Sequence, residues 1–189
     1  TAVTMYLGFH KYGDEYKVMG LAPYGKPRFV KEFRKLIQPS AAGFKLDLSY
    51  FTHVQNGIKM SWDNGDPVID PFFSQKMIDT FGPAARGRED LTSHHEDIAA
   101  SLQAVTEEVI FHLAECLHRQ RPSDRLCFAG GCAMNSVANG KLRNSTPFKE
   151  IYIPPGPRLG DFAMDGSVLT NAFHDKLLFE KLNFKVPPR

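Results

Sequence analysis

The feature that most constrains the fold lies between residues 125 and 153, where two short apolar segments flank a glycine pair and a helical stretch. Arg125–Ala129 has the length and composition of a buried strand and ends at Gly130-Gly131. Ala133–Leu142 then favours a helix, and Glu150–Ile153 favours a second strand. A strand, a tight turn, a helix and another strand are typical of an α/β layout with short parallel strands.

The longest helix is predicted to begin after Thr92 and to run to about Arg119. Ser93 and Glu96 have the spacing of a capping box, in which each residue satisfies a free backbone N–H group of the other. One continuous apolar face follows at three- and four-residue steps and is expected to be core: Ile98, Leu102, Val105, Val109, Leu113 and Leu117. The adjacent His94 and His95 would point to different sides of the helix start, so we expect surface residues and not a metal pair.

The first 90 residues predict smaller elements. Tyr16–Pro27 contains two Gly and two Pro and is expected to be an ordered loop. The other predicted elements are a helix at Arg28–Ile37, strands of one small sheet at Phe44–Leu48 and Gly57–Trp62, a turn at Asp63–Asp66, and a helix at Phe72–Phe81 that Gly82-Pro83 ends.

Composition excludes some classes of partner. The formal net charge is +2 and no dense Lys/Arg stripe is present, so we expect neither a nucleic-acid nor a membrane partner. No apolar run approaches the ~20 residues that cross a bilayer. An odd number of cysteines in apolar surroundings predicts free buried thiols in a reducing cytoplasm: Cys116, Cys127 and Cys132. Without a Met start or a signal architecture, the chain is expected to be cut from a longer one.

The glycine pair is the first candidate binding site. Gly130 and Gly131 lack the Cβ atoms that keep a ligand away from the backbone, and the next helix start offers N–H groups to a phosphate or ribose. Asn135 has an amide that could bond a ribose hydroxyl. The alternative is a strand-to-helix turn without a ligand.

Two further candidates carry charge. Asp161 and Asp165, in the sequence PPGPRLGDFAMDG after the second strand, could reach a metal or a substrate hydroxyl, although Asp161 could instead cap a helix at Met164–Leu177. Lys17, in YKVMGLAPYG, could pair with a phosphate, or it could be a solvated charge.

Four segments closely resemble, in order, the NodU/CmcH/TobZ-type O-carbamoyltransferase family. They are EYKVMGLAPYG (15–25), DIAASLQAVTEEV (97–109), AGGCAMNSVANGKL (129–142) and FKEIYIPP (148–155). The resemblance implies an α/β fold of the actin/sugar-kinase/Hsp70 (ribonuclease H-like) type, present as a partial domain. Residues 28–90 would be an inserted helix and small β-sheet region, 93–177 the nucleotide-binding core, and 183–189 a linker to a missing module.

The resemblance also implies a reaction. In the family a YrdC-like module makes carbamoyl-adenylate from carbamoyl phosphate and ATP, and the actin-like module passes the carbamoyl group to a hydroxyl of a small-molecule acceptor. A metal, iron in the family pattern, polarises the carbonyl group. Gly130, Gly131 and Asn135 fall on the family's GGVALN nucleotide motif, Asp161 falls on its Gly-Asp metal motif, and Lys17 lies in a signature loop.

Two departures from the family leave an alternative open. Around Asp161 the family pattern is Gly-Asp-x-Gly-x-Ala-x-Gly, whereas this chain has GDFAMDG, which makes Asp165 a competitor. No counterpart of the upstream histidine metal ligands, of the N-terminal lobe or of the YrdC-like module is found. The fragment is therefore expected to be inactive alone, and the alternative is a non-catalytic nucleotide-binding or interaction domain of the same fold.

Overall fold

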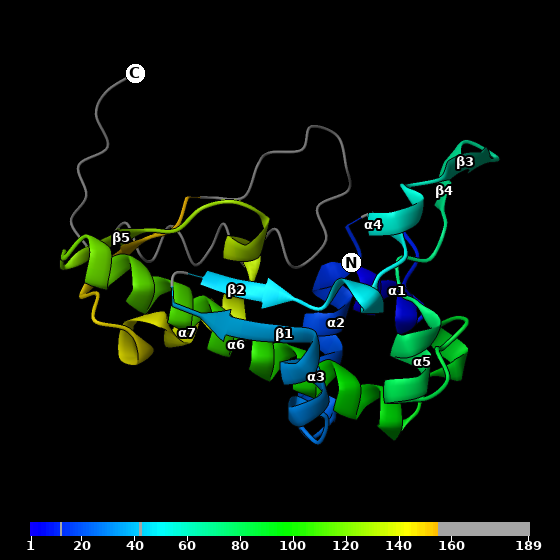
Figure 1. Ribbon diagram of the computed structural model, residues 1–189, viewed down its shortest axis with the longest axis horizontal. Coiled ribbons are helices and arrows are strands. Elements are labelled where there is room, and N and C mark those ends of the chain that lie inside the picture. Colours follow the sequence, from blue (N-terminus) through cyan, green and yellow to red (C-terminus); the bar gives the residue numbers. More distant parts are fainter. Residues whose placement is uncertain (12, 42, 155–189) are drawn as a thin grey trace. The chain divides into compact units, whose positions relative to one another are not determined.

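The computed structural model describes residues 1–154 except 12 and 42, and shows a mixture of helices and short strands (Figure 1). The helices are α1 Ala2–Tyr6, α2 Glu15–Leu21, α3 Val30–Leu36, α4 His53–Asn56, α5 Gln75–Phe81, α6 Ser93–Gln120 and α7 Ser136–Ser145. The strands are β1 Ile37–Ser40, β2 Gly43–Leu46, β3 Met60–Asp63, β4 Asp66–Ile69, β5 Arg125–Cys127 and β6 Glu150–Tyr152. Short 3-10 turns cover Ala22–Tyr24, Leu48–Tyr50, Arg88–Asp90 and Gly131–Met134.

The chain divides into two compact units, Thr1–His112 and a second that begins at Leu113. The first unit therefore contains residues 28–90 together with the N-terminal helices and most of α6. The predicted linker 183–189, the predicted helix 164–177 and both aspartates at 161 and 165 lie outside the described residues.

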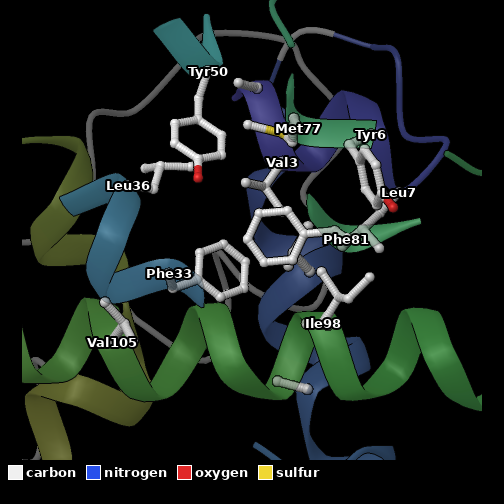
Figure 2. Close-up of a cluster of buried hydrophobic side chains, with 14 of the residues drawn as sticks. Val3, Tyr6, Leu7, Phe33, Leu36, Tyr50, Met77, Phe81, Ile98 and Val105 are labelled. Carbon is white, nitrogen blue, oxygen red and sulfur yellow. The ribbon is translucent and has the colours of Figure 1, made fainter. Parts of the chain in front are cut away.

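The core of the first unit is built by aromatic and aliphatic side chains from α1, α3, α5 and α6. Tyr6, Phe33 and Phe81 are almost fully buried, and the rings of Phe33 and Phe81 lie 4.6 Å apart between centroids. Ile98 and Val105 stand on one side of α6 and point toward these rings (Figure 2). The amphipathic pattern of α3 and the first half of the apolar face of α6 are thereby confirmed.

The apolar face of α6 does not stay buried along its whole length. Ile98, Val105 and Val109 are buried, whereas Leu113 is 36% exposed and Leu117 is 46% exposed. The prediction that the face is core as far as Leu117 is therefore wrong at its last two positions. In this part of the helix the buried residues are Ala114 and Cys116, and the apolar cluster of the second unit is formed by Ala114, Leu126 and Phe148.

The start of α6 differs from the predicted capping box. The backbone N–H groups of His95 and Glu96 both donate to the Thr92 carbonyl, and His95 Nδ1 lies 3.2 Å from the Thr92 nitrogen and 3.0 Å from its hydroxyl. The reciprocal pair is therefore Thr92 and His95, one residue before the predicted Ser93 and Glu96. Histidine at the third helical position supplies the acceptor that Glu or Gln usually supplies.

The histidine pair is not a surface pair. His95 is 6% exposed and its Nε2 lies 3.2 Å from the Pro83 carbonyl oxygen. His94 is half-buried, with Nε2 2.6 Å from the Phe81 carbonyl oxygen. The surface prediction is wrong because both rings lie within hydrogen-bond distance of backbone carbonyl groups at the end of α5. The spacing of residues within α6 gives no information about these partners.

The predicted strands around residues 44 and 60 are present, but they do not pair with each other. β1 and β2 form one antiparallel hairpin, and β3 and β4 form a second. The turn of the second hairpin is Asn64-Gly65, and both residues have a positive φ, as hairpin turns of this length favour. The partners β1 and β4 each contain a proline, which two-stranded hairpins tolerate because one edge of every strand is unpaired.

The segment predicted as a loop at residues 16–27 is mostly helical. α2 covers Glu15–Leu21 and continues directly into the 3-10 turn Ala22–Tyr24. Gly20 lies inside α2, where a Cβ atom would meet no neighbour within 4 Å among the described residues. Pro23 lies in the first turn of the 3-10 segment, where no backbone N–H is needed. The glycine and the proline are therefore compatible with helix.

The strand–turn–helix–strand prediction for the second unit is confirmed. β5 and β6 are parallel, with Leu126 opposite Ile151, and α7 lies between them in the chain. Cys116 is buried as expected, but Cys127 and Cys132 are exposed, so the prediction of three buried thiols is wrong for two of them. Within the described residues, none of the helices is both long and apolar enough to span a bilayer.

Candidate functional site

The glycine turn joins β5 to α7 through an exposed backbone segment. Gly130 has φ 96° and ψ −179°, a conformation that is essentially restricted to glycine, and Gly131 opens the 3-10 turn that follows. A Cβ atom added at either glycine would meet no atom of residues 1–154 within 4 Å. Among the described residues, the backbone N–H groups of Gly131 and Cys132 have no hydrogen-bond partner. The turn therefore has both space and unpaired donors.

Asn135 is the N-cap of α7. Its side-chain oxygen accepts a hydrogen bond from the Ala138 N–H at 3.0 Å. Sequence reasoning predicted a ribose contact for this amide and did not consider the cap, which stabilises a helix start by about 0.5–2 kcal/mol. The amide oxygen of Asn135 therefore already has a structural role at the start of α7.

Sequence reasoning missed Asn139, one turn further along α7. Its amide nitrogen donates to the Ala133 carbonyl at 2.7 Å and so braces the 3-10 turn. Its Oδ1 is buried and has no partner among the described residues. The sequence contains one signal for Asn139, which is its spacing. It follows Asn135 by four residues, and residues four apart lie on the same face of a helix.

A second junction joins two of the segments that carry the family resemblance. Asp97, 8% exposed, accepts a hydrogen bond from the Lys26 N–H at 2.6 Å, and its other oxygen lies 3.3 Å from the Arg28 guanidinium. The Ser101 hydroxyl accepts from the Phe29 N–H at 2.9 Å and donates to the Asp97 carbonyl at 2.6 Å. A Cβ atom at Gly25 would overlap the backbone of Glu96 and Asp97, so only glycine permits this approach.

Lys17 lies on α2 in the first unit. Its ammonium group is 2.6 Å from the Asp14 carboxylate, and it also lies 5.9 Å from the ring centroid of Phe9. Asp14 in turn accepts from the Lys11 N–H at 3.2 Å. Lys17 is thus engaged in an ion pair and belongs to a different unit from Gly130, Gly131 and Asn135.

Of the predicted site residues, the structure brings together Gly130, Gly131 and Asn135 in one turn. Asp161, the predicted metal ligand, and its competitor Asp165 lie outside the described residues. Within residues 1–154, no group of three or more His, Cys, Asp or Glu side chains is arranged to hold a metal ion. The described residues therefore contain no set of ligands for the metal that the resemblance implies.

Comparison with known proteins identifies relatives over most of the chain. The family model for the carbamoyltransferase N-terminus matches residues 1–168. The uncharacterized protein sll1178 of Synechocystis is 36% identical over 185 residues, which are 96% of this chain and 28% of that protein. Nodulation protein NolO of Bradyrhizobium diazoefficiens is 30% identical over 175 residues, 88% of this chain and 26% of that protein.

A shorter match relates 54 residues, 29% of this chain, to 9% of the energy-dependent translational throttle protein EttA of Escherichia coli at 47% identity. This match is too short to assign a family. By contrast, the family model and sll1178 agree over nearly the whole chain, although the chain spans only about a quarter of the length of sll1178 and NolO. The chain belongs to the family of the carbamoyltransferase N-terminus.

Proposed function

We propose that this chain is part of an O-carbamoyltransferase and forms one lobe of an actin-like nucleotide-binding module. In the proposed reaction, an acceptor hydroxyl oxygen attacks the carbamoyl carbon of carbamoyl-adenylate. The new C–O bond forms as the bond to the adenylate phosphate breaks, AMP leaves, and the hydroxyl proton passes to a base. Carbamoyl phosphate and ATP would supply the adenylate in a YrdC-like module of the same polypeptide.

The observation that carries the nucleotide role is the turn at Gly130-Gly131, taken with the family membership. The turn follows the carboxyl end of a parallel strand, which is where open α/β sheets bind ligands. It is exposed, it leaves open space at both Cβ positions, and it offers unpaired N–H groups at Gly131 and Cys132 in the described part of the chain. Unpaired backbone donors of this kind suit a phosphate group.

The direct test is ATP binding to the full-length parent by isothermal titration, with Gly131→Val beside the unmodified protein. Because Gly131 has no positive φ and no atom of the described residues within 4 Å of its Cβ position, a valine is compatible with the turn as described and would occupy the space proposed for the ligand. We expect ATP affinity to be lost while the fold is kept. Gly140→Ala, also free of neighbours but inside α7, is the matched control and should bind ATP normally. Unchanged affinity in a folded Gly131→Val parent would leave only a structural turn.

The proposed roles of Lys17 and of the metal rest only on the resemblance to the family. For Lys17 to bind a phosphate, its ammonium group would exchange the Asp14 carboxylate for the ligand. For the metal, Asp161 is the proposed ligand and iron the proposed ion, with the remaining ligands upstream in the parent.

The altered sequence GDFAMDG favours one rival, a non-catalytic nucleotide-binding or interaction domain of the same fold. Metal content of the full-length parent separates the two. An Asn isostere keeps the shape of an aspartate and loses its charge, so Asp161→Asn should lower metal content and carbamoyl transfer at least ~10-fold, while Asp165→Asn should lower neither. Normal metal content with a lowered melting temperature in Asp161→Asn would identify a helix cap and favour the rival.

A further inference from the structure

The segment from Tyr24 to Arg28 is attached to α6 more firmly than an exposed turn requires. Its backbone meets α6 at Gly25, where only glycine fits, and at Lys26, whose N–H donates to the buried Asp97 carboxylate at 2.6 Å. Phe29, directly after the segment, donates to Ser101 at 2.9 Å. We name residues 24–28 the anchored loop. Loops that a rigid scaffold positions in this way commonly carry binding residues.

The side chains of the anchored loop are directed to solvent. Tyr24 is 76% exposed, the largest exposed fraction among the large hydrophobic side chains of the described residues. Neither the Tyr24 hydroxyl nor the Lys26 ammonium group has a partner among residues 1–154. In the described part of the chain these two polar groups therefore make no contact of their own, whereas the backbone that carries them is held against α6.

The anchored loop carries two positively charged side chains, Lys26 and Arg28. The Arg28 guanidinium offsets the charge of Asp97 at 3.3 Å, and its side chain is 66% exposed. Of the five N–H donors of a guanidinium, most have no partner within the described residues. The Lys26 charge is not offset by an ion pair in the described part of the chain. Two cations two residues apart on a fixed backbone suit a phosphate group.

We propose that the anchored loop binds a phosphate group of a substrate through Lys26 and Arg28, with Tyr24 covering the bound ligand, and that Asp97 is the positioning residue that fixes the loop. The inference rests on the proposed function, which supplies two phosphate-bearing ligands, ATP and carbamoyl phosphate. It assigns roles to Tyr24, near the end of the segment 15–25, and to Lys26 and Arg28, which follow that segment and had no role in the sequence analysis, and it is separate from the glycine turn.

The test is calorimetric titration of the full-length parent with ATP and, in a separate arm, with carbamoyl phosphate. Lys26→Ala should weaken binding of one of the two by about tenfold to a hundredfold, because a hydrogen bond to a charged group is lost, and the arm affected identifies the ligand. Lys26→Arg should restore most of the affinity. Lys31→Ala, which removes an exposed lysine five residues further along, is the matched control and should bind both ligands normally.

Asp97 is tested by the same titrations. Asp97→Ala removes the acceptor for the Lys26 N–H and should weaken the same ligand as Lys26→Ala, whereas Asp97→Asn keeps an acceptor oxygen and should recover part of the affinity. Binding of both ligands to Lys26→Ala as tightly as to the unmodified parent would overturn the inference and leave the proposed function intact. An unmodified parent that binds neither ligand would overturn both.

Discussion

Gly130 and Gly131 are adjacent in the sequence and are constrained differently. Gly130 has a φ of 96° that other residues rarely adopt, whereas Gly131 has an ordinary φ and no described atom within 4 Å of its Cβ position. We expect Gly130→Ala to lower the free energy of unfolding by about 1–3 kcal/mol, and Gly131→Ala to change it by less than about 0.5 kcal/mol. Urea unfolding of the purified chain measures both. Equal losses in the two variants would contradict the backbone conformation described for the turn.

Asp47 gives a prediction about pH. The hydrogen bond from the Lys76 ammonium group, at 2.7 Å, together with those from Ser49, lowers the pKa of Asp47 from 3.8 to about 2. A carboxyl whose pKa is lower in the folded state stabilises the fold above its unfolded pKa, and the contribution is lost as pH falls from 3.8 through about 2. Asp47→Asn should therefore be less stable than the unmodified chain at pH 6, with the difference shrinking below pH 3.8.

Urea unfolding at a series of pH values checks this, at low salt because the pair is exposed and screened by ions. A stability difference that is the same at pH 6 and near pH 2 would show that the carboxylate charge contributes nothing. The Lys76 ammonium group also lies 4.5 Å from the ring centroid of Tyr50, so Lys76→Ala would remove two contacts and is the less specific variant.

Single residues were predicted from the sequence where their environment is local and missed where it is not. The special backbone of the Gly130-Gly131 turn follows from a glycine pair between a strand and a helix. By contrast, Asp97 contacts Lys26 across 71 positions, and His95 contacts Pro83 across 12. The periodicity of a helix does not indicate which distant residues its side chains contact. The anchored loop was therefore missed, and the histidines were wrongly assigned to the surface.

At the scale of elements, the start of α6 tests which residues form the cap. His95 accepts from the Thr92 backbone and contacts the Pro83 carbonyl, whereas the Ser93 side chain is exposed. His95→Ala should lower the free energy of unfolding by about 1–2 kcal/mol, because the Thr92 N–H loses its acceptor and the Pro83 carbonyl oxygen keeps only its contact with the Tyr6 hydroxyl at 3.3 Å. Ser93→Ala, the matched control, should be nearly neutral. Thermal and urea unfolding would contradict the assignment if Ser93→Ala were the more costly change.

Elements with a clear apolar pattern were predicted, and elements interrupted by glycine or proline were missed. α6, β5, β6 and α7 carry apolar residues at helical or strand spacing and were all found, with α7 shifted by about one turn. β1 and β4 were not predicted, and each contains a proline, which a strand tolerates where one of its edges is unpaired. α2 was missed because Gly20 and Pro23 suggested a loop, although tertiary packing of Val18 outweighs the propensity of one glycine.

At the scale of the whole molecule, the chain spans 28% of sll1178 and 26% of NolO. We expect the purified 189-residue chain to show no carbamoyl transfer and no consumption of ATP with carbamoyl phosphate, because no counterpart of the adenylate-forming module is found in it. Release of inorganic phosphate and pyrophosphate measures this. Turnover by the isolated chain would contradict the assignment of adenylate formation to another module.

The boundary between the two compact units falls inside α6, between His112 and Leu113, so the last eight of its 28 residues belong to the second unit. A helix of this length is about 42 Å long and its backbone hydrogen bonds are continuous across the boundary. Recombination between relatives at that boundary would join two halves of α6 that come from different proteins. The side chains of the two halves would not have evolved together. Viable chimeras are therefore expected to cross over before Thr92 or after Arg121, where the helix has ended and Pro122 prevents its continuation.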